Sequence, residues 1–291
     1  MKTTVIIATH ARPLSLTRLL EGLAPQIEKD SREIIIADNG TPEPAALPSQ
    51  LCRKERFTHL HDPHPGKCRI QNKAIKKAAG EILVFLDDDL TVGTNYLDEV
   101  EAFFDKHPEF AAMKGRIVPA EDPAAKVGPM APYLDLPIVD HGDEVVEVKG
   151  VLGANMAFRA DAIAKVGHFD ERLGPGACGH EEETEMSIRL RRAGYRIGYA
   201  PRAVAYHEVD PTRANRARFI RIARERGRCR MIHEEHSIGK LFDILGKYAI
   251  AAIRLRVASI AGAGLARIAR EERRLAVAQG MLDGLRGRFT P

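Results

Sequence analysis

An unbroken apolar run, Ile82–Leu86, leads directly into three consecutive aspartates, Asp87, Asp88 and Asp89. An apolar run of this length, rich in branched residues, is typical of a buried parallel strand. Parallel sheets bind ligands at the carboxyl ends of their strands, where three carboxylates repel one another unless a cation lies between them. Oxygen ligands favour Mg²⁺ or Mn²⁺, and Mg²⁺ is usually shared with substrate phosphates. The segment therefore predicts a metal-dependent enzyme with a phosphorylated substrate, whereas an acidic loop that caps a helix would not need the apolar run.

Length and composition describe a globular chain with an uneven charge distribution. The 291 residues are 44% apolar and 29% charged, enough to bury a sizeable core. Residues 1–200 carry 25 Lys and Arg against 31 Asp and Glu, whereas residues 201–291 carry 19 against 9. An anionic partner is therefore expected to act on the basic C-terminal part.

The cysteines and the apolar segments bear on where the protein functions. The four cysteines lack paired spacing: Cys52, Cys68, Cys178 and Cys229. This spacing argues against a zinc site and a disulfide framework, and it predicts a reducing compartment. The apolar segment before His10 is too short for a signal peptide, and residues 241–264 contain too many charges for a membrane span. We expect a cytoplasmic protein, or one that is peripheral on the inner face of a membrane.

Strand-like and helix-like segments alternate from the N-terminus. The expected strands are residues 4–9, 33–37 and 82–86, and the expected helices are residues 14–23, 69–79 and 95–107. Residues 41–65 hold many helix and strand breakers and are expected to be irregular with one short helix. Residues 119–150 form a long Pro- and Asp-rich excursion. The alternating beginning predicts an α/β fold with a parallel, doubly wound sheet.

The second half of the chain is expected to change from mixed to helical structure. The expected elements are a segment over residues 151–158, helices over 161–166 and 181–193, and short strands over 195–200 and 204–207. After about residue 212 the pattern is helical and rich in arginine. The chain contains neither an internal repeat nor a low-complexity segment.

Several polar motifs together resemble the family 2 glycosyltransferases, inverting enzymes of the GT-A fold, over about residues 3–230. The motifs are Thr9–Pro13 after the first strand, Asp38–Gly40 after the second, Asp87–Asp89, Gly153–Met156, Phe169–Glu171 and Glu182–Glu185. Their order and spacing are more specific than any single motif. The resemblance implies an α/β GT-A fold, a mostly parallel sheet flanked by helices with a helical C-terminal extension. Its domains are a catalytic domain over 1–212, with a nucleotide-sugar half of about 1–115 and an acceptor half of about 116–212, and a basic helical extension over 213–291.

The resemblance assigns roles in binding to particular residues. Binding of the sugar nucleotide is assigned to Thr9, Arg12, Asp38, Asp87 and Asp88, with Asp38 on the base and Asp87 near the ribose. Asp89 is expected to bind Mn²⁺ or Mg²⁺, with Asp87 and His207 as further metal ligands. Asn155, Met156 and Asp170 are expected near the acceptor. Gln71 replaces the family's usual arginine, and Lys67 or Arg69 is expected to compensate as a cation near the diphosphate.

Transfer with inversion requires one carboxylate that removes the proton of the acceptor hydroxyl. A metal neutralises the charge on the departing diphosphate, so no general acid is needed. Glu183 is the candidate base, because Glu185 then precedes Arg189 by four residues as in the family motif. Glu182 is the second candidate, since the family usually has Asp at the position of Glu183. Alone, this acidic run would be interpreted as an ordinary first helical turn.

The expected partners follow from the same resemblance. They are a nucleotide-diphosphate sugar, with UDP favoured over GDP or TDP, and a sugar, lipid-linked or small-molecule acceptor. The absence of tryptophan excludes the family's Gln-x-x-Arg-Trp signature of processive synthases, so transfer of a single sugar is favoured. The C-terminal segment, residues 239–286, alternates apolar patches with Arg and Lys, which leaves open contact with a membrane surface or with a second subunit. Nucleic acid is not an expected partner, because the Arg-rich segment lacks interleaved aromatic residues apart from Phe219.

Three rival hypotheses remain. A phosphatase of the haloacid dehalogenase type would use Asp87 as a nucleophile, but that motif normally follows the first strand of its fold. A nucleotidyltransferase would need a Gly-rich phosphate loop, which Thr9–Pro13 does not provide. A protein that binds nucleotide sugars without turnover would not need all of the carboxylates.

Overall fold

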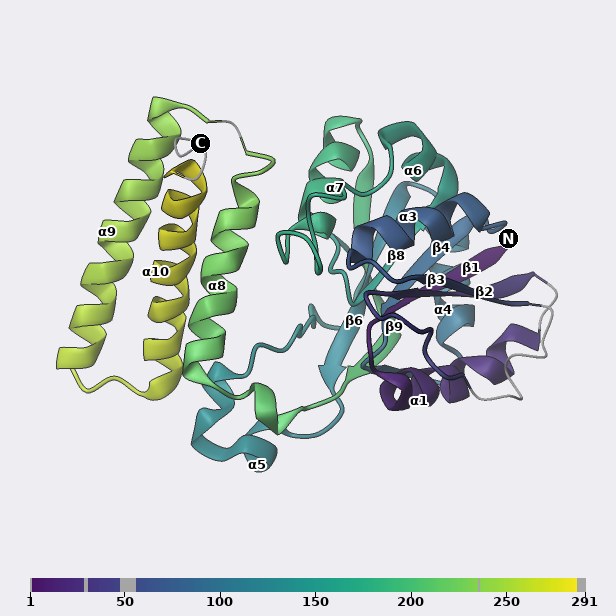
Figure 1. Ribbon diagram of the computed structural model, residues 1–291, viewed down its shortest axis with the longest axis horizontal. Coiled ribbons are helices and arrows are strands. Elements are labelled where there is room, and N and C mark those ends of the chain that lie inside the picture. Colours follow the sequence, from purple (N-terminus) through teal and green to yellow (C-terminus); the bar gives the residue numbers. More distant parts are fainter. Residues whose placement is uncertain (1, 29–30, 48–55, 235, 287–291) are drawn as a thin grey trace.

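The computed structural model describes residues 2–28, 31–47, 56–234 and 236–286 (Figure 1). The strands are β1 (Thr3–Thr9), β2 (Arg32–Asn39), β3 (Phe57–Asp62), β4 (Ile82–Asp87), β5 (Leu90–Val92), β6 (Phe110–Pro119), β7 (Val146–Glu147), β8 (Asn155–Arg159) and β9 (Arg196–His207). The α-helices are α1 (Pro13–Leu23), α3 (Lys67–Lys77), α4 (Tyr96–Lys106), α5 (Pro123–Val127), α6 (Ala160–Val166), α7 (Glu182–Arg192), α8 (Arg216–Arg230), α9 (Ile238–Ile260) and α10 (Leu265–Arg286). Short 3₁₀ helices are η1 (Ala24–Glu28), η2 (Gly128–Tyr133) and η3 (Pro211–Arg213).

All of these strands belong to one mixed sheet. Its order is β3-β2-β1-β4-β8-β6-β9-β5, and β7 also pairs with β9. The pairs among β3, β2, β1 and β4 are parallel, as is β6 with β9, whereas β8 runs antiparallel to β4 and β6. The register sets Ala8 beside Asp87 and Thr9 beside Asp38, so the predicted polar residues meet at one edge. The α/β fold with a helical C-terminal region is confirmed.

Each face of the sheet is covered by helices, which explains the unbroken apolar strands. Neighbouring residues of a strand point to opposite faces, and here both faces are buried. Val84 packs with α1 and α4, whereas Phe85 packs with α3, α6 and α7. Figure 1 shows α1 and α4 on one side of the sheet and α3, α6 and α7 on the other.

Four details differ from the sequence-based expectations. Residues 57–62, expected to be irregular, form the edge strand β3, whose side chains are mostly half-buried. The strand β6 was not predicted, because its alanines, lysine and glycine favour no sheet by themselves. Residues 196–207 form one strand, not two, and β6 follows it through a register shift near Gly115. The short helix expected within 41–65 is not seen in residues 41–47 or 56–65, and residues 48–55 lie outside the described part.

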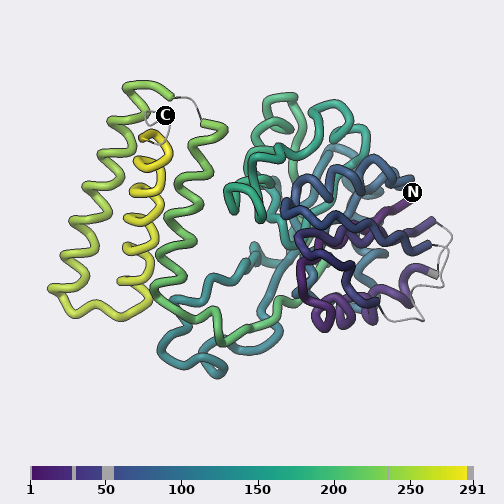
Figure 2. Tube along the Cα trace, viewed as in Figure 1, coloured from purple at the N-terminus to yellow at the C-terminus, as the bar shows by residue number. Residues whose placement is uncertain are grey.

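The three long C-terminal helices pack beside the sheet domain. In Figure 2 the chain runs from β9 through η3 into α8. Of the three helices, α9 lies farthest from the sheet. Two glycines bring α8 and α10 close together: a Cβ at Gly227 would lie 2.0 Å from the carbonyl oxygen of Val277, and one at Gly280 would lie 1.9 Å from that of Arg224. In the part of the chain that the structure describes, none of the helices combines the length and apolar character needed to cross a bilayer.

Candidate active site

A cavity of about 730 Å³ lies between the carboxyl edge of the sheet, the beginning of α7 and the helices α8 and α10. Its lining includes many of the predicted site residues: Thr9, Arg12, Lys67, Asp87, Asp88, Asp89, Glu182, Glu183 and His207. The lining does not include five others: Asp38, Arg69, Asn155, Met156 and Asp170. The tertiary structure therefore brings the triple aspartate and the acidic run at α7 to one space.

The first two aspartates of the run face different partners. Asp87 ends β4 and accepts a bond of 2.6 Å from the Lys67 Nζ. Asp88 is buried and accepts bonds of 2.8 Å from the Thr9 hydroxyl and 2.9 Å from the Arg12 Nη1. Burial raises the pKa of Asp88, although Arg12 and Thr9 act in the opposite direction. Through Asp88 the triple aspartate is therefore bonded to Thr9 and Arg12, at the end of β1 and just after it.

Asp89 is surrounded by two arginines and a histidine. Its Oδ2 accepts bonds of 3.0 Å from both Arg12 and Arg213, and its Oδ1 lies 3.3 Å from the His207 Nε2. The pairing of β5 with β9 places Leu90 beside His207, which explains why a residue 118 positions later reaches the aspartates. Burial raises the pKa of Asp89, but His207, Arg213 and Arg12 outweigh it, so the pKa is lowered and the carboxylate is ionised.

The arrangement of Asp89 and His207 fits a divalent ion. Two neighbouring ligands of an octahedral ion, each at about 2.1 Å, are about 3 Å apart, close to the 3.3 Å between Asp89 Oδ1 and His207 Nε2. Among the described residues, no group of three or more His, Cys, Asp or Glu could hold a metal. A site with two protein ligands therefore needs oxygens from a substrate, as is usual for Mg²⁺ bound with phosphates.

Lys67 connects the two acidic parts of the cavity. It is the first residue of α3, after Gly66, whose φ of 141° suits glycine. Its Nζ lies 2.6 Å from Asp87 Oδ1 and 3.8 Å from Glu182 Oε1. Burial lowers the pKa of Lys67, but Asp87 and Glu182 outweigh it and the pKa is raised. A charged ammonium is thus held between the two sets of carboxylates.

The acidic run at the start of α7 has three distinct environments. Glu181 has a φ of 77°, and its buried carboxylate accepts bonds from Arg230 and lies 3.3 Å from His233 Nε2. Glu182 is buried beside Lys67. Burial raises the pKa of Glu183 to about 8, with a further contribution from Glu182. Glu183 is only partly buried and faces the cavity, so its carboxyl group is poised to exchange a proton near neutral pH.

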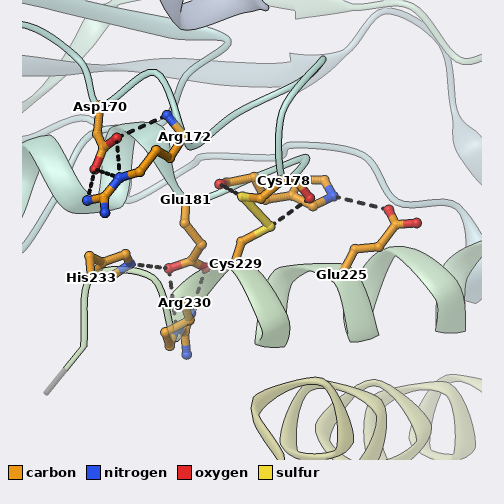
Figure 3. Close-up of a disulfide and its surroundings, with 9 residues drawn as sticks. Asp170, Arg172, Cys178, Glu181, Glu225, Cys229, Arg230 and His233 are labelled. Carbon is orange, nitrogen blue, oxygen red and sulfur yellow. Dashed lines mark hydrogen bonds and ion pairs between the residues drawn. A yellow bond between two sulfur atoms is a disulfide. The ribbon is translucent and has the colours of Figure 1, made fainter. Parts of the chain in front are cut away.

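A disulfide joins the loop before α7 to α8 (Figure 3). Cys178 and Cys229 are bonded across a sequence separation of 51 residues. The argument from spacing against disulfides was wrong for this pair, because residues without paired spacing are brought together when α8 packs against the loop. The inference of a reducing compartment therefore loses its basis. Figure 3 shows the disulfide beside the Glu181–Arg230 ion pair, so two links fix the start of α7 to α8.

Two residues predicted to bind the donor lie beside the cavity without lining it. Asp38 is buried; its Oδ2 accepts a bond from the Ala45 amide and lies 3.1 Å from His59 Nε2, and its Oδ1 has no hydrogen-bond partner in the described structure. Arg69 forms an ion pair of 3.2 Å with Asp62 and donates to the His64 carbonyl. Lys67, not Arg69, therefore supplies the cation of α3 that reaches the cavity.

The three residues predicted near the acceptor are used within the protein. The side chain of Asn155 is fully buried, accepts from the Tyr96 hydroxyl, and donates to the carbonyl oxygens of Arg116 and Ala203. Met156 is part of the core. Asp170 pairs with Arg172. The residues immediately before Asn155 line the cavity instead: Leu152, Gly153 and Ala154.

The cavity also has walls that no sequence motif indicated. Asp135 follows η2 and pairs with Arg226 of α8 at 2.7 Å and with Arg273 of α10 at 3.8 Å. His180 lines the same region, and burial together with Arg226 lowers its pKa to about 4. The dense run of arginines in α8 was a signal for some of these contacts, but the sequence does not show which of them face inward.

Comparisons with known proteins identify the family of this chain. Residues 4–163 match the family model described as glycosyl transferase family 2. The glucosyl-dolichyl phosphate glucuronosyltransferase of Haloferax volcanii is 22% identical over 72% of this chain and 70% of its own length. The succinoglycan biosynthesis protein ExoM of Rhizobium meliloti is 28% identical over 78% of this chain and 72% of its own length. The pre-mycofactocin glycosyltransferase of Mycobacterium tuberculosis is 28% identical, and the match covers 70% of this chain and only 42% of that protein.

Solved structures share the fold. A mannosyltransferase of Pyrobaculum calidifontis, in complex with GDP-Man and Mn²⁺, superposes with a TM-score of 0.63 at 18% identity over 98% of this chain and 87% of its own. GalNAc-T7 with UDP, GalNAc and Mn²⁺ has a TM-score of 0.52 at 13% identity over 77% of this chain and 47% of its own. These likenesses confirm the GT-A fold. Because the family model matches more than half of the chain, the protein belongs to glycosyl transferase family 2 and is a glycosyltransferase.

Proposed function

We propose that this glycosyltransferase moves one sugar, with inversion, from a nucleotide-diphosphate sugar to an acceptor hydroxyl, and that a divalent metal assists. One observation carries the proposal: the triple aspartate and the Glu182–Glu183 pair line the same cavity, and Lys67 connects them. The proposed donor site and the proposed base would therefore share one space. The proposed domains are those expected from the sequence, residues 1–212 for catalysis and 213–291 as the helical extension.

The donor is proposed to bind at the carboxyl ends of β1, β2 and β4. The buried Asp38 Oδ1 has no partner within the described structure and would accept a hydrogen bond from a nucleobase N–H. Arg12 and Arg213 lie at Asp89, where they would pair with diphosphate oxygens. UDP is the first nucleotide to test, and the structural neighbours that bind GDP-Man or UDP support a nucleotide-sugar donor in general.

Asp89 and His207 would hold Mn²⁺ or Mg²⁺, with Asp87 at the same edge. The metal would supply positive charge for the departing diphosphate. The protein's own cations act on the same group: Arg12 and Arg213 are already oriented by Asp89, so little ordering is required when the diphosphate binds. The structural neighbours with Mn²⁺ support the proposal.

Glu183 is the proposed general base, and Glu182 the second candidate. Glu182 is buried and its carboxylate lies 3.8 Å from the Lys67 ammonium, so it is already engaged by a cation of the protein. Glu183 lines the cavity with a raised pKa, which suits proton removal near neutral pH. Burial is the main cause of that raised pKa, and the neighbouring Glu182 adds to the shift. The phosphatase hypothesis is not favoured, since Asp87 is held by Lys67 and the chain belongs to a glycosyltransferase family.

The proposal is tested with a panel of UDP-, GDP- and TDP-sugars, each with and without Mn²⁺, scored by protection against thermal unfolding. We expect one donor to raise the midpoint of unfolding, and the increase to need Mn²⁺. The Asp89→Asn variant is expected to lose the increase in the midpoint that needs Mn²⁺. The matched control is Asp105→Asn, in the exposed last turn of α4, which should keep that increase. Absence of protection by every nucleotide sugar under both conditions would contradict the proposal.

A further inference from the structure

The helix α9 exposes an apolar face that nothing in the described structure covers. Eight of the thirteen exposed large hydrophobic residues lie on this helix, at Ile238, Leu241, Phe242, Leu245, Ile250, Ile253, Val257 and Ile260. Four of them are more than 60% exposed, namely Ile238 (77%), Phe242 (69%), Ile253 (64%) and Ile260 (81%), and the last three lie in one direction. Single exposed apolar residues are common on soluble proteins, but a contiguous face of this kind marks a surface for binding.

The face points away from the rest of the molecule. The buried residues of α9 recur every seven positions, at Ile244, Ala251 and Ala258. Residues two positions apart on an α-helix lie about 160–200° apart around its axis, so Phe242, Ile253 and Ile260 point nearly opposite to this buried seam. Figure 1 agrees, since α9 lies at the far side of α10 and α8 from the sheet. The apolar side chains therefore do not serve to hold the helices together.

Four exposed arginines lie on α9 itself and on the first two turns of α10, the next helix along the chain. Arg254 and Arg256 of α9 and Arg267 and Arg270 of α10 are exposed and form no ion pair with any described residue. From residue 237 to residue 270 the only acidic residue is Asp243, which pairs with Lys247. A second copy of the chain would bring the same unpaired arginines against these, so self-association through the face is opposed by charge. An anionic membrane surface would cover the apolar side chains and also pair with the arginines.

We propose that the α9 face, defined by the eight residues above and Arg254, Arg256, Arg267 and Arg270, binds an anionic phospholipid bilayer. The helix lies on the membrane and does not cross it, which agrees with the absence of a spanning helix in the described residues. The apolar side chains enter the boundary between headgroups and acyl chains, and the arginines contact lipid phosphates and other anionic headgroups. This attachment goes beyond the proposed transfer reaction and does not depend on it.

The test is co-sedimentation of the full-length protein with vesicles of phosphatidylcholine alone or with 30% phosphatidylglycerol. We expect binding to the anionic vesicles and at least tenfold weaker binding to the neutral ones. The double variant Phe242→Ser/Ile253→Ser is expected to bind anionic vesicles roughly 30-fold more weakly. Leu14→Ser removes an equally exposed side chain from α1, at 76% exposure, and is expected to bind as the wild type does.

A second variant separates charge from apolar contact. Arg254→Gln/Arg256→Gln is expected to lower binding to anionic vesicles about 25-fold, at about fivefold per arginine, with little change on neutral vesicles. Thermal midpoints equal to the wild type show that each variant is folded, since none of these side chains belongs to the buried seam. Equal binding to both vesicle types, or no binding to either, would overturn the proposal. So would a dimer in solution that the Phe242→Ser/Ile253→Ser variant converts to a monomer.

Discussion

The Lys67 ammonium lies 2.6 Å from the carboxylate of Asp87, and this contact joins the helix α3 to the end of β4. The same ammonium is 3.8 Å from Glu182. A single cation thus neutralises part of the charge of two acidic clusters that are about 95 residues apart in sequence. Its position depends on Gly66 and Gly176, because a Cβ at Gly176 would lie 2.4 Å from the Gly66 amide nitrogen.

Replacing Lys67 is expected to harm both stability and activity. Lys67→Met removes the cation between the partly buried Asp87 and the buried Glu182, and we expect the free energy of unfolding to fall by about 3 kcal/mol. The loss of positive charge should also raise the pKa of Glu183 above its present value, because Lys67 acts to lower it. Urea unfolding and the pH dependence of kcat/KM measure the two effects. Lys76→Met, on the exposed side of α3, is the control; an equal loss there would show that the contact is not special.

The raised pKa of Glu183 predicts the pH dependence of transfer. A base must be ionised to accept a proton, so kcat/KM is expected to rise with pH and level off above about 8, the pKa of Glu183. Glu183→Gln should keep donor binding, lose this rise and lower transfer by about 10²- to 10⁴-fold. Glu185→Gln alters a glutamate of the same helix that pairs with Arg189 outside the cavity, and it should retain the profile. Full activity of the Glu183→Gln variant would shift the assignment to Glu182.

The raised pKa of Glu183 also predicts how the stability of the folded protein changes with pH. Because the pKa of Glu183 is higher in the folded than in the unfolded protein, the folded state binds more protons between about pH 4.5 and 8. The contribution of Glu183 to the free energy of unfolding is complete below about pH 4.5 and is lost as the pH rises through about 8. Glu183→Gln should therefore be more stable than the wild type at pH 9 and nearly equal to it at pH 5. Chemical unfolding at both values of pH checks this; a variant less stable at pH 9 would contradict it.

The disulfide between Cys178 and Cys229 is expected to stabilise the acidic side of the cavity. By the chain-entropy relation, closing a loop of 51 residues contributes about 4 kcal/mol. Cys178→Ser/Cys229→Ser should lower the midpoint of thermal unfolding and reduce kcat more than donor affinity, because the loop leads into Glu181–Glu183 and not to the aspartates. Dithiothreitol should reproduce the effect in the wild type and leave the double variant unchanged. A wild type that is indifferent to the reductant would argue against a stabilising role.

Metal removal tests the pairing of Asp89 with His207. We expect EDTA to abolish the protection that a nucleotide sugar gives, and Mn²⁺ to restore it. His207→Ala should require at least tenfold more Mn²⁺ for the same protection, because one of two protein ligands is lost. His141→Ala, at an exposed position outside the cavity lining, should behave as the wild type. Unchanged Mn²⁺ dependence in His207→Ala would remove this histidine from the proposed metal site.

Much of the fold was predictable where local pattern and tertiary environment agree. The apolar runs of β1, β2 and β4 are buried on both faces, so their sequences contain a continuous signal. In contrast, β6 contains residues that suit several structures, and its pairing with β8 and β9 decides its conformation. The edge strand β3 is half-buried and has only a weak apolar pattern.

The candidate site divides in the same way. Asp87–Asp89 were found because they follow a recognisable strand, and Glu182–Glu183 because they begin a recognisable helix. The expected acceptor residues Asn155 and Met156 point into the protein, since alternation along β8 and its neighbours on both sides leave no open face there. The Cys178–Cys229 bond joins a loop to a helix 51 residues later, a contact for which sequence spacing has no signal.

By itself the sequence determined the apolar strands β1, β2 and β4, the motifs that follow them and the family. It did so because each of these depends on neighbouring residues, through apolar periodicity and short motifs. Only the tertiary structure decided that Lys67 links the two acidic clusters, that α8 and α10 close the cavity, and that the apolar face of α9 remains uncovered. Those features depend on how distant segments pack, which is a property of the whole folded chain.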